Sequence, residues 1–381
     1  MDKALHDTLT GWRRHLHANP ELTLHEAETS KFVQARLAEM GIPFVANVGG
    51  HGVVATITRG QSNRAVGLRA DMDALPILET TGLPHASTNQ GVMHACGHDG
   101  HTTSLLGAAA LLKDDPGWTG TVHLVFQPAE EGGGGAKSMI ADGLFARFPM
   151  ERIFGYHNWP GLEAGTVMVH DGPSMAAGAR IFITVKGHAG HAAMPHLTRD
   201  PMVATAHLII ALQSIVARNV DPQESAVVTI GTIRGGSAAN QIPESIELRG
   251  TMRTFKPAVR DLIEARIRDV CDGVARMFGM EIDLKIPRGV EVTVNTAAEA
   301  DMAVAVAREQ GIAVRRDLAP TMGGEDFSWF LKERPGCYAW IGNGPAEPGK
   351  ELHNPAYDFN DAILPVAATW LASVAKKSLA G

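Results

Sequence analysis

The central part of the chain has a pattern of strands and helices that differs from the pattern on either side of it. Its six elements follow the order β-α-β-β-α-β, which is the order of a ferredoxin-like unit. Alternating and helical hydrophobic patterns place these elements at 180–186, 201–218, 225–234, 245–255, 258–278 and 281–286. We therefore expect a small α+β domain at residues 174–288, inserted into a larger domain that is split between 1–173 and 289–381.

The flanking parts alternate short apolar strands with helices, which is typical of an α/β sandwich. Strands are expected at 52–58, 64–69, 121–127, 152–156 and 337–341, and helices up to about Met40 and at 102–112, 297–310 and 361–377. Polar residues directly follow several of these strands, as Asp71 and Asp73 do. Because α/β sheets gather functional groups beyond the carboxyl ends of their strands, we expect the site there.

Composition narrows the possible partners and the compartment. The net charge is −7 and no basic block occurs, which argues against nucleic acid or an anionic membrane surface as a partner. The N-terminus is charged from Asp2 and lacks the apolar core of a signal peptide, and the most apolar helical run, 208–216, is short for a membrane span. Three cysteines are too few for a disulfide scaffold. We expect a soluble, cytoplasmic protein.

The densest group of potential metal ligands lies in the segment 94–102, which reads HACGHDGHT. Cys96 and His98 are two residues apart, so in an extended segment their side chains would leave the same face. A thiolate and an imidazole on one face are a start for a site that binds zinc or a similar divalent ion.

Three further donors make a larger site possible. Glu131 and His157 follow predicted strands, and His353 lies in a late loop. Together with Cys96 and His98 they exceed the four ligands of one structural zinc, so we expect two divalent ions with a shared ligand, and a thiolate can bridge. Such a pair can clamp an attacking hydroxide and polarise a carbonyl. For any single histidine, a hydrogen-bonded core position is an equal alternative.

The adjacent carboxylates Glu130 and Glu131 could have two different roles in the site. If both are extended they point to opposite sides, so that Glu131 can bind metal while Glu130 faces the substrate as a general base. The alternative is a solvated acidic turn before the glycines that follow. Asp73, just past its strand, is expected to accept a hydrogen bond from a metal-binding imidazole.

Five longer motifs occur along the chain: RADMDALP at 69–76, HACGHDGH at 94–101, QPAEE at 127–131, GHAAMPH at 190–196 and MGGEDF at 322–327. Together they resemble the group of hippurate hydrolase, N-acyl-L-amino acid amidohydrolase and indole-acetyl-amino-acid hydrolase, within the dinuclear-metal aminoacylase/carboxypeptidase superfamily. The resemblance implies a three-layer α/β/α, zinc-exopeptidase-like catalytic domain with an inserted ferredoxin-like lid or dimerisation domain.

The resemblance also assigns roles in the larger domain. It implies that Cys96, His98, Glu131, His157 and His353 bind two divalent ions and that Glu130 is the catalytic base. The wider superfamily usually has a bridging aspartate and a His-x-Asp pair at the strand end. This chain has Cys96 and Asp71-Met-Asp73 instead, which matches the cysteine-containing subgroup. The metal remains open among zinc, manganese, cobalt and nickel, because a thiolate favours softer ions.

In similar enzymes the inserted domain pairs two subunits, and its histidine reaches into the partner's site to stabilise the oxyanion. By resemblance His191 is that histidine, and Asn240 and Arg253 resemble groups that hold the substrate's carboxylate. An arginine suits this task because its planar guanidinium can donate two parallel hydrogen bonds to a carboxylate. From the residues alone, a structural role for each of the three is the stronger interpretation. The resemblance thus implies a homodimer.

The leading hypothesis is an amidohydrolase that cleaves N-acyl amino acids, such as acetyl or benzoyl derivatives, through metal-bound hydroxide. A dipeptidase or carboxypeptidase of the same superfamily is the alternative. A non-catalytic binding protein would be expected to lack Glu130 or one of the five ligands, and all six residues are present. The acyl specificity is not readable from the sequence, although Trp329 is a candidate for an acyl pocket.

Overall fold

The computed structural model describes residues 1–380 and separates two compact units. The first unit comprises Met1–Ser174, Thr293–Ala319 and the chain from Asp326 onward, and the second comprises Met175–Val292 and Pro320–Glu325. The sequence-based boundaries lie close to these positions but placed 320–325 in the larger domain. That segment joins the second unit because Thr321 bridges to Met175 and the Ala176 amide donates to the Gly323 carbonyl over 2.8 Å.

The first unit is built on an eight-stranded sheet in the order β1-β2-β4-β3-β5-β16-β6-β15. Its strands are β1 (Phe44–Val48), β2 (Gly52–Arg59), β3 (Ala65–Asp71), β4 (Gly120–Gln127), β5 (Arg152–Pro160), β6 (Val167–Met168), β15 (Val314–Arg315) and β16 (Gly336–Gly344). The central strands β4, β3, β5 and β16 are mutually parallel, so their carboxyl ends share one edge. Buried parallel strands read as apolar runs, which is why the sequence revealed them.

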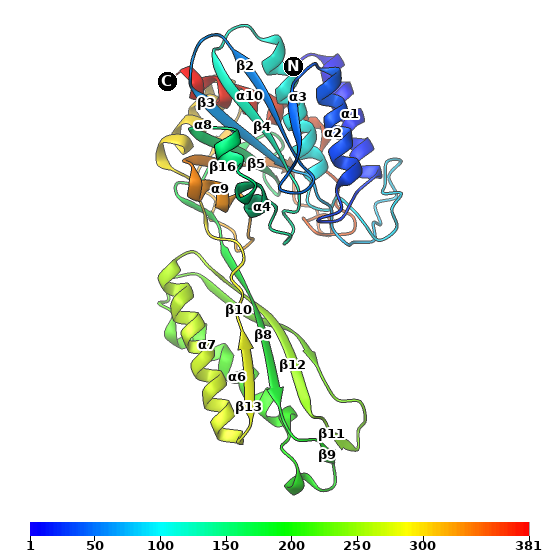
Figure 1. Cartoon of the computed structure of the whole chain (residues 1–381), viewed down its shortest axis with the longest axis vertical. Helices are drawn as coiled ribbons and strands as arrows, with labels where there is room; N and C mark the ends of the chain where they lie inside the picture. Colours follow the sequence, from blue (N-terminus) through cyan, green and yellow to red (C-terminus); the bar gives the residue numbers. More distant parts are fainter. Residues whose placement is uncertain (381) are drawn as a thin grey trace. The chain divides into compact units, whose positions relative to one another are not determined.

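Helices cover both faces of this sheet (Figure 1). They are α1 (Lys3–Ala18), α2 (Ala27–Glu39), α3 (His98–Asp114), α4 (Gly135–Ala141), α5 (Leu144–Arg147), α8 (Ala297–Glu309), α9 (Ser328–Glu333), η2 (Asp361–Ile363) and α10 (Leu364–Ala380). Tyr156 and Ala339 belong to the core that includes α3 and α10. Tyr338 alternates to the other face and stacks on Phe327, beside α9. The predicted α/β sandwich is confirmed.

Two local expectations in this unit were wrong. The single opening helix is two helices, separated at 19–26, because Asn19 and Pro20 interrupt the first one and proline restricts the residue before it. Strand β5 continues to Pro160 rather than ending at 156, so His157 lies within a strand and not after it.

The second unit is a four-stranded antiparallel sheet in the order β10-β12-β8-β13, with two helices packed on it. Its elements are β8 (Ala177–Lys186), β9 (Gly190–His191), η1 (Pro195–Leu197), α6 (Pro201–Asn219), β10 (Ala226–Arg234), β11 (Gln241–Ile242), β12 (Ser245–Thr254), α7 (Pro257–Phe278) and β13 (Glu281–Lys285). Two short strands, β7 (Pro173–Met175) and β14 (Thr293–Val294), lie where the chain passes between the units. The element order is that of a ferredoxin-like unit.

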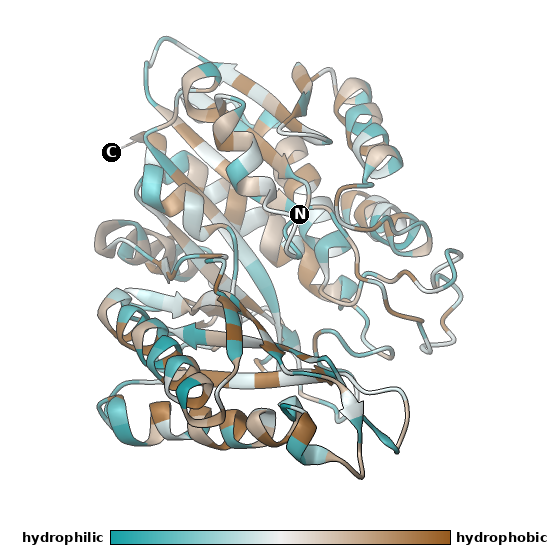
Figure 2. Cartoon of the chain, turned by 60° about the horizontal axis from the view of Figure 1, so that its bottom comes forward, coloured by the Kyte–Doolittle hydropathy of each residue, from teal (hydrophilic) through white to brown (hydrophobic). Residues whose placement is uncertain are grey.

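The helices of the second unit begin and end where their sequences indicate. Asp200 caps α6 by accepting a hydrogen bond from the Met202 amide over 2.8 Å, and Pro201 occupies the first helical position. Gly279 ends α7 in the left-handed conformation, at φ 62°. Hydrophobic and hydrophilic residues are mixed along α7, as in an amphipathic helix, whereas α6 is more apolar (Figure 2).

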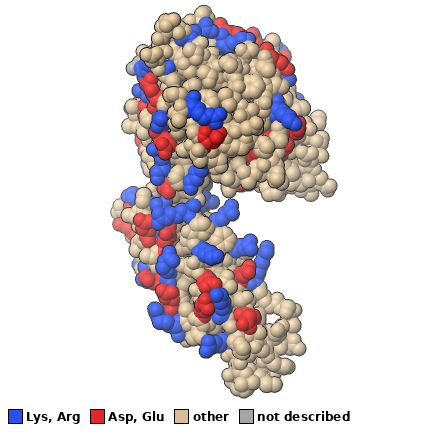
Figure 3. Space-filling view, in the orientation of Figure 1, with Lys and Arg blue, Asp and Glu red and all other residues tan. Residues whose placement is uncertain are grey.

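Helix α6 is, among the described residues, the one helix long and apolar enough to cross a membrane by length and composition. A core helix passes the same test, and residues such as Leu208 and Leu212 of α6 are buried in the core of the second unit. Charged side chains of both signs are intermixed on the face shown in Figure 3, and ion pairs such as Lys186 with Glu281 join them.

Candidate metal centre

Cys96 and His98 are placed by the start of α3. His98 is the first residue of that helix, and Gly97 before it has a φ of 89°. A Cβ at Gly97 would lie 2.2 Å from Nδ2 of Asn158, so only glycine fits this turn. The expected extended segment is therefore wrong. The two side chains approach each other through a left-handed turn into a helix.

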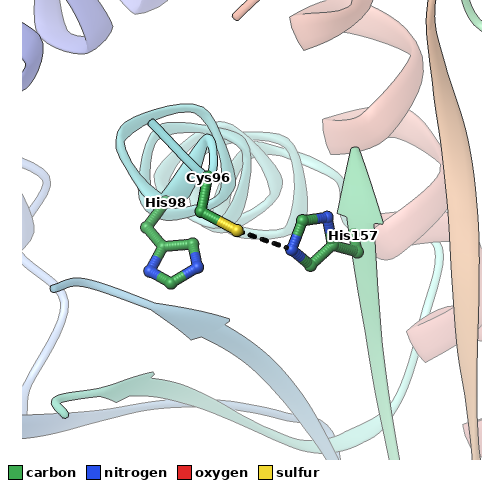
Figure 4. Close-up of side chains that lie close together, drawn as sticks. All are labelled: Cys96, His98 and His157. Carbon is green, nitrogen blue, oxygen red and sulfur yellow. Dashed lines mark hydrogen bonds between the residues drawn. The ribbon is translucent and has the colours of Figure 1, made fainter. Parts of the chain in front are cut away.

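His157 reaches the same place from the sheet. Figure 4 shows the His98 and His157 rings on either side of the Cys96 thiol, with Nε2 of His157 3.3 Å from Sγ. The Nδ1 atom of His157 donates to the Asn158 carbonyl over 2.7 Å. The Nδ1 atom of His98 donates to the Asp73 carbonyl over 2.8 Å, while its buried Nε2 has no hydrogen-bond partner. Both rings therefore present Nε2 as the atom free to bind a metal.

Glu130 and Glu131 lie in a turn after β4. Ala129 has a φ of 55°, and the two glutamates that follow are in a turn and not in a strand. The extended geometry expected for them is therefore wrong. Asp73 holds this turn, because its Oδ1 accepts from the Glu130 amide over 3.0 Å and its Oδ2 accepts from the Glu131 amide over 2.9 Å. Its Oδ1 also lies 3.4 Å from Nδ1 of His98.

His353 completes the cluster from a late loop. Its backbone amide donates to the Ala95 carbonyl over 2.7 Å, and its Nε2 lies 3.2 Å from Oε1 of Glu131. The His353 side chain is 53% exposed, so it forms the open side of an otherwise buried cluster. Several groups of the described residues have ligand atoms that all lie within 4.8 Å of one another, and three of these groups contain the predicted ligands: Cys96, His98 and His157; Cys96, Glu131 and His353; and His98, Glu130 and Glu131.

The charge of the cluster fits a bound divalent cation. Burial by itself lowers the pKa of His98, but the Asp71 and Asp73 carboxylates raise it to about 10. Burial, and next the Glu131 carboxylate, raise the pKa of the Cys96 thiol well above its usual value. With no cation bound, His98 and Cys96 therefore keep their protons, and these protons limit the negative charge of the cluster. A divalent ion would displace the protons and offset the same charge.

A second layer of buried groups supports these donors. Arg69, on β3, donates to Asp71 Oδ2 over 2.7 Å, to Gln127 Oε1 over 2.8 Å and to Asp326 Oδ1 over 3.2 Å. The Asp326 amide in turn donates to Oε1 of Glu130 over 3.3 Å. Arg69 thus connects the strand ends to the turn that faces Glu130.

A parallel chain of hydrogen bonds runs toward His157. The Nδ1 atom of His101 donates to Oδ1 of Asp71 over 2.6 Å, and its Nε2 accepts from the Asn158 amide over 3.0 Å. The Asn158 carbonyl is the group that accepts from His157. His101 therefore helps to orient His157.

Comparison with known proteins identifies the family. The sequence model of peptidase family M20/M25/M40 matches residues 67–377. The chain belongs to this family. A solved dinuclear metal-binding peptidase of family M20 from Bacillus subtilis is 35% identical and superposes with a TM-score of 0.86, over 100% of this chain and 99% of that one. The superfamily and the hydrolase class expected from the motifs are confirmed, as is a site for divalent metal.

Curated relatives match nearly the whole of this chain. A hippurate hydrolase of Campylobacter jejuni is 43% identical over 96% of this chain and 95% of the relative. An N-acetyl-L-cysteine deacetylase of Bacillus subtilis is 40% identical over 98% and 89%, respectively. An IAA-amino acid hydrolase of Arabidopsis thaliana is 39% identical over 98% and 86%.

The remaining predicted residues of this M20 protein lie in the second unit. His191 and Asn240 are exposed neighbours, since β9 pairs His191 with Gln241 of β11 and the Ala192 amide donates to the Asn240 carbonyl over 3.0 Å. Arg253 pairs with Gly178 near the far end of β12. Strand β12 begins shortly after β11, and Arg253 lies near its other end. At about 3.3 Å per residue along a strand, Arg253 is therefore roughly 25 Å from the start of β12.

Sequence reasoning missed Arg69, His101, Asn158 and Asp326 as parts of this site. Arg69 left a trace in the sequence, because a charged residue inside an apolar strand is buried and must be paired. Asn158 left no trace, and Asp326 lies in the motif MGGEDF at 322–327, which did not indicate its role. Each is recognised only by its partners, which are 57 and 196 residues away in the chain.

Proposed function

We propose that this M20 protein is a metal-dependent amidohydrolase that cleaves N-acyl amino acids to a carboxylate and a free amino acid. The observation that carries the proposal is the buried set of thiol, imidazole and carboxylate donors around Cys96, with Glu130 beside it. The relatives named as a hippurate hydrolase, an N-acetyl-L-cysteine deacetylase and an IAA-amino acid hydrolase support it.

The proposed metal ligands are Cys96, His98, Glu131, His157 and His353, holding two divalent ions of zinc, manganese, cobalt or nickel, with Cys96 shared between them. When bound, the ions would supply a Lewis acid that polarises the amide carbonyl and makes water more acidic. The unpartnered Nε2 of His98 and the carboxylate-rich surroundings support this assignment.

Glu130 is the proposed general base. It takes a proton from water as the water adds to the amide carbonyl, and it returns the proton to the nitrogen of the leaving amino acid. The side chain is 9% exposed, and its Oε1 accepts a hydrogen bond from the Asp326 amide. That contact orients the carboxylate, while Asp73 fixes the backbone on which it is carried.

The second unit is the proposed lid and dimerisation domain. In this proposal His191 stabilises the oxyanion in the partner's site of a homodimer. Asn240 and Arg253 hold the substrate's carboxylate, and because they lie far apart in one subunit, they reach it from the two different subunits. The exposure of His191 and Asn240 on one ribbon supports an outward-facing role for these two. We also propose a cytoplasmic location, with neither nucleic acid nor membrane as a partner, in keeping with the net charge of −7 and three free buried cysteines.

Two matched substitutions test the separate roles of the adjacent glutamates. Glu130→Gln is expected to keep the metal content of the wild type and to lower the turnover of N-acyl amino acids by roughly 10²- to 10⁴-fold. Glu131→Gln is expected to lose bound metal. Metal content is measured by elemental analysis and turnover by release of the free amino acid. Wild-type turnover in Glu130→Gln would contradict its role as the base.

A substrate panel tests the reaction class. Chelated enzyme is supplied with zinc, manganese, cobalt or nickel and offered N-acetyl amino acids, N-benzoyl amino acids and dipeptides. We expect the N-acyl amino acids to be hydrolysed fastest with at least one metal. Faster hydrolysis of dipeptides would favour the dipeptidase alternative, and no turnover with any metal would overturn the proposal.

A further inference from the structure

Trp159 lies beside the metal cluster and on the same side of the sheet. It follows His157 by two residues on β5, so the two side chains leave the same face. The centroids of their rings are 6.1 Å apart, with the planes at 77°. An indole therefore borders the proposed metal ligands.

The Trp159 ring is held in place from behind. It stacks on Trp340 of β16 with centroids 3.7 Å apart and planes only 3° from parallel. Trp340 is the register partner of His157 in the neighbouring strand and is 2% exposed. The buried His170 ring packs edge-on against Trp340, at 4.3 Å. Because this base is rigid, Trp159 is preorganised, although its own ring stays partly exposed.

Trp329, the tryptophan that the sequence suggested for an acyl pocket, has different surroundings. The Nζ atom of Lys137 lies 3.8 Å from the centroid of its ring, and that of Lys332 lies 5.6 Å away. The Trp329 ring thus already contacts cations of the chain itself. Both tryptophans are partly exposed, so Trp329 is a matched control for Trp159.

We propose that Trp159 forms the floor of the acyl subsite and makes the enzyme prefer planar aromatic acyl groups to acetyl. The inference rests on the proposed amidohydrolase function and specifies its substrate class. Stacked aromatic rings attract each other beyond the effect of buried area, and a preorganised ring loses little entropy on binding. A benzoyl or indolyl group gains this contact, whereas an acetyl group is too small to use it.

The test compares N-benzoylglycine with N-acetylglycine as substrates. Trp159→Leu is expected to lower kcat/KM for N-benzoylglycine by about tenfold, the equivalent of one good stacking contact, and to change it by less than about twofold for N-acetylglycine. Trp159→Phe, which keeps a ring, should retain most of the preference. Trp329→Leu should leave the ratio of the two kcat/KM values unchanged. Equal losses on both substrates, or no loss on either, would overturn the inference.

A binding measurement keeps this test apart from the proposed function. Calorimetry with the Glu130→Gln variant, with and without Trp159→Leu, gives Kd for the same two compounds in the absence of turnover. Weaker binding of the benzoyl compound alone supports the aromatic floor even if the wild type proves to hydrolyse another amide. Kd values that Trp159→Leu leaves unchanged for both compounds would refute it, whatever the reaction is.

Discussion

At the scale of single residues, buried charges organise the site. Arg69 is 1% exposed and donates to acceptors from several segments of the chain, among them Asp71, Gln127 and Asp326. A buried arginine is retained only where its donors are satisfied, and its removal leaves the partner carboxylates buried without compensation. Arg64, just before the same strand, makes instead an exposed pair with Glu151, over 3.1 Å.

The two arginines are therefore expected to differ sharply in their effect on stability. Arg69→Met should lower the free energy of unfolding by about 3–5 kcal/mol, since it strands buried carboxylates. Arg64→Met should lower it by only about 0.2–1 kcal/mol, because its pair with Glu151 is solvated. Urea denaturation of both variants measures the difference. Similar losses in the two would mean that the Arg69 network contributes no more than a surface pair.

At the scale of elements, the start of α3 depends on close approach between segments. Gly100 lies in its first turn, and a Cβ there would lie 2.3 Å from the ring of Phe359. Phe359 follows His353 in the late loop, so this contact brings the loop to the helix that carries His98. Gly11, in the middle of α1, has open space around the position of a Cβ.

Alanine substitution at these two helical glycines should have opposite effects. Gly100→Ala should destabilise the protein by about 1–3 kcal/mol and reduce its metal content, because Phe359 and its loop must move. Gly11→Ala should stabilise it by about 0.5–1 kcal/mol, as alanine favours a helix where nothing obstructs it. Thermal unfolding and elemental analysis measure the two properties. An unchanged metal content in Gly100→Ala would show that the loop is not positioned by this contact.

At the scale of the whole first unit, a buried ion cluster joins the two ends of the chain. Arg13 and His17 of α1 are fully buried. Arg13 donates to Asp358 over 2.7 Å, and His17 lies 2.8 Å from Asp99 and 3.3 Å from Glu79 through its two nitrogens. Burial by itself, and the charge of Arg13, lower the pKa of His17, but the hydrogen bonds to Asp99 and Glu79 raise it to about 10.

This shift predicts a stability that falls as the pH rises. The folded-state pKa of about 10 exceeds the ordinary histidine pKa of 6.5 in the unfolded chain, so the contribution of protonated His17 is complete below pH 6.5 and is lost as the pH approaches 10. The stability advantage of the wild type over His17→Gln should thus be on the order of a few kcal/mol at pH 6 and much smaller at pH 10. Denaturation of both proteins across this range measures it.

A surface histidine provides the control for that comparison. His25 is exposed, and His25→Gln should change the free energy of unfolding by less than about 0.5 kcal/mol at either pH. If the free energy of unfolding of the wild type exceeds that of His17→Gln by the same amount at pH 6 and pH 10, His17 is neutral in the folded protein.

Most of the elements and their order could be predicted from the sequence, because burial imposes a period on the hydrophobic residues of each strand and helix. The sequence therefore predicted both the sheet of the first unit and the β-α-β-β-α-β order of the second. It also predicted a site for divalent metal, since thiol, imidazole and carboxylate groups at strand ends are recognisable by type.

Only the tertiary structure decided how those groups approach each other. Cys96 and His98 meet through a left-handed glycine, and Glu130 and Glu131 through a turn held by Asp73, where the sequence suggested extended chain. The hydrogen bonds that orient them, and the stacking of Trp159 on Trp340, join segments far apart in the chain. Hydrophobic periodicity is a local property, whereas such contacts depend on packing between segments and leave no period in the sequence.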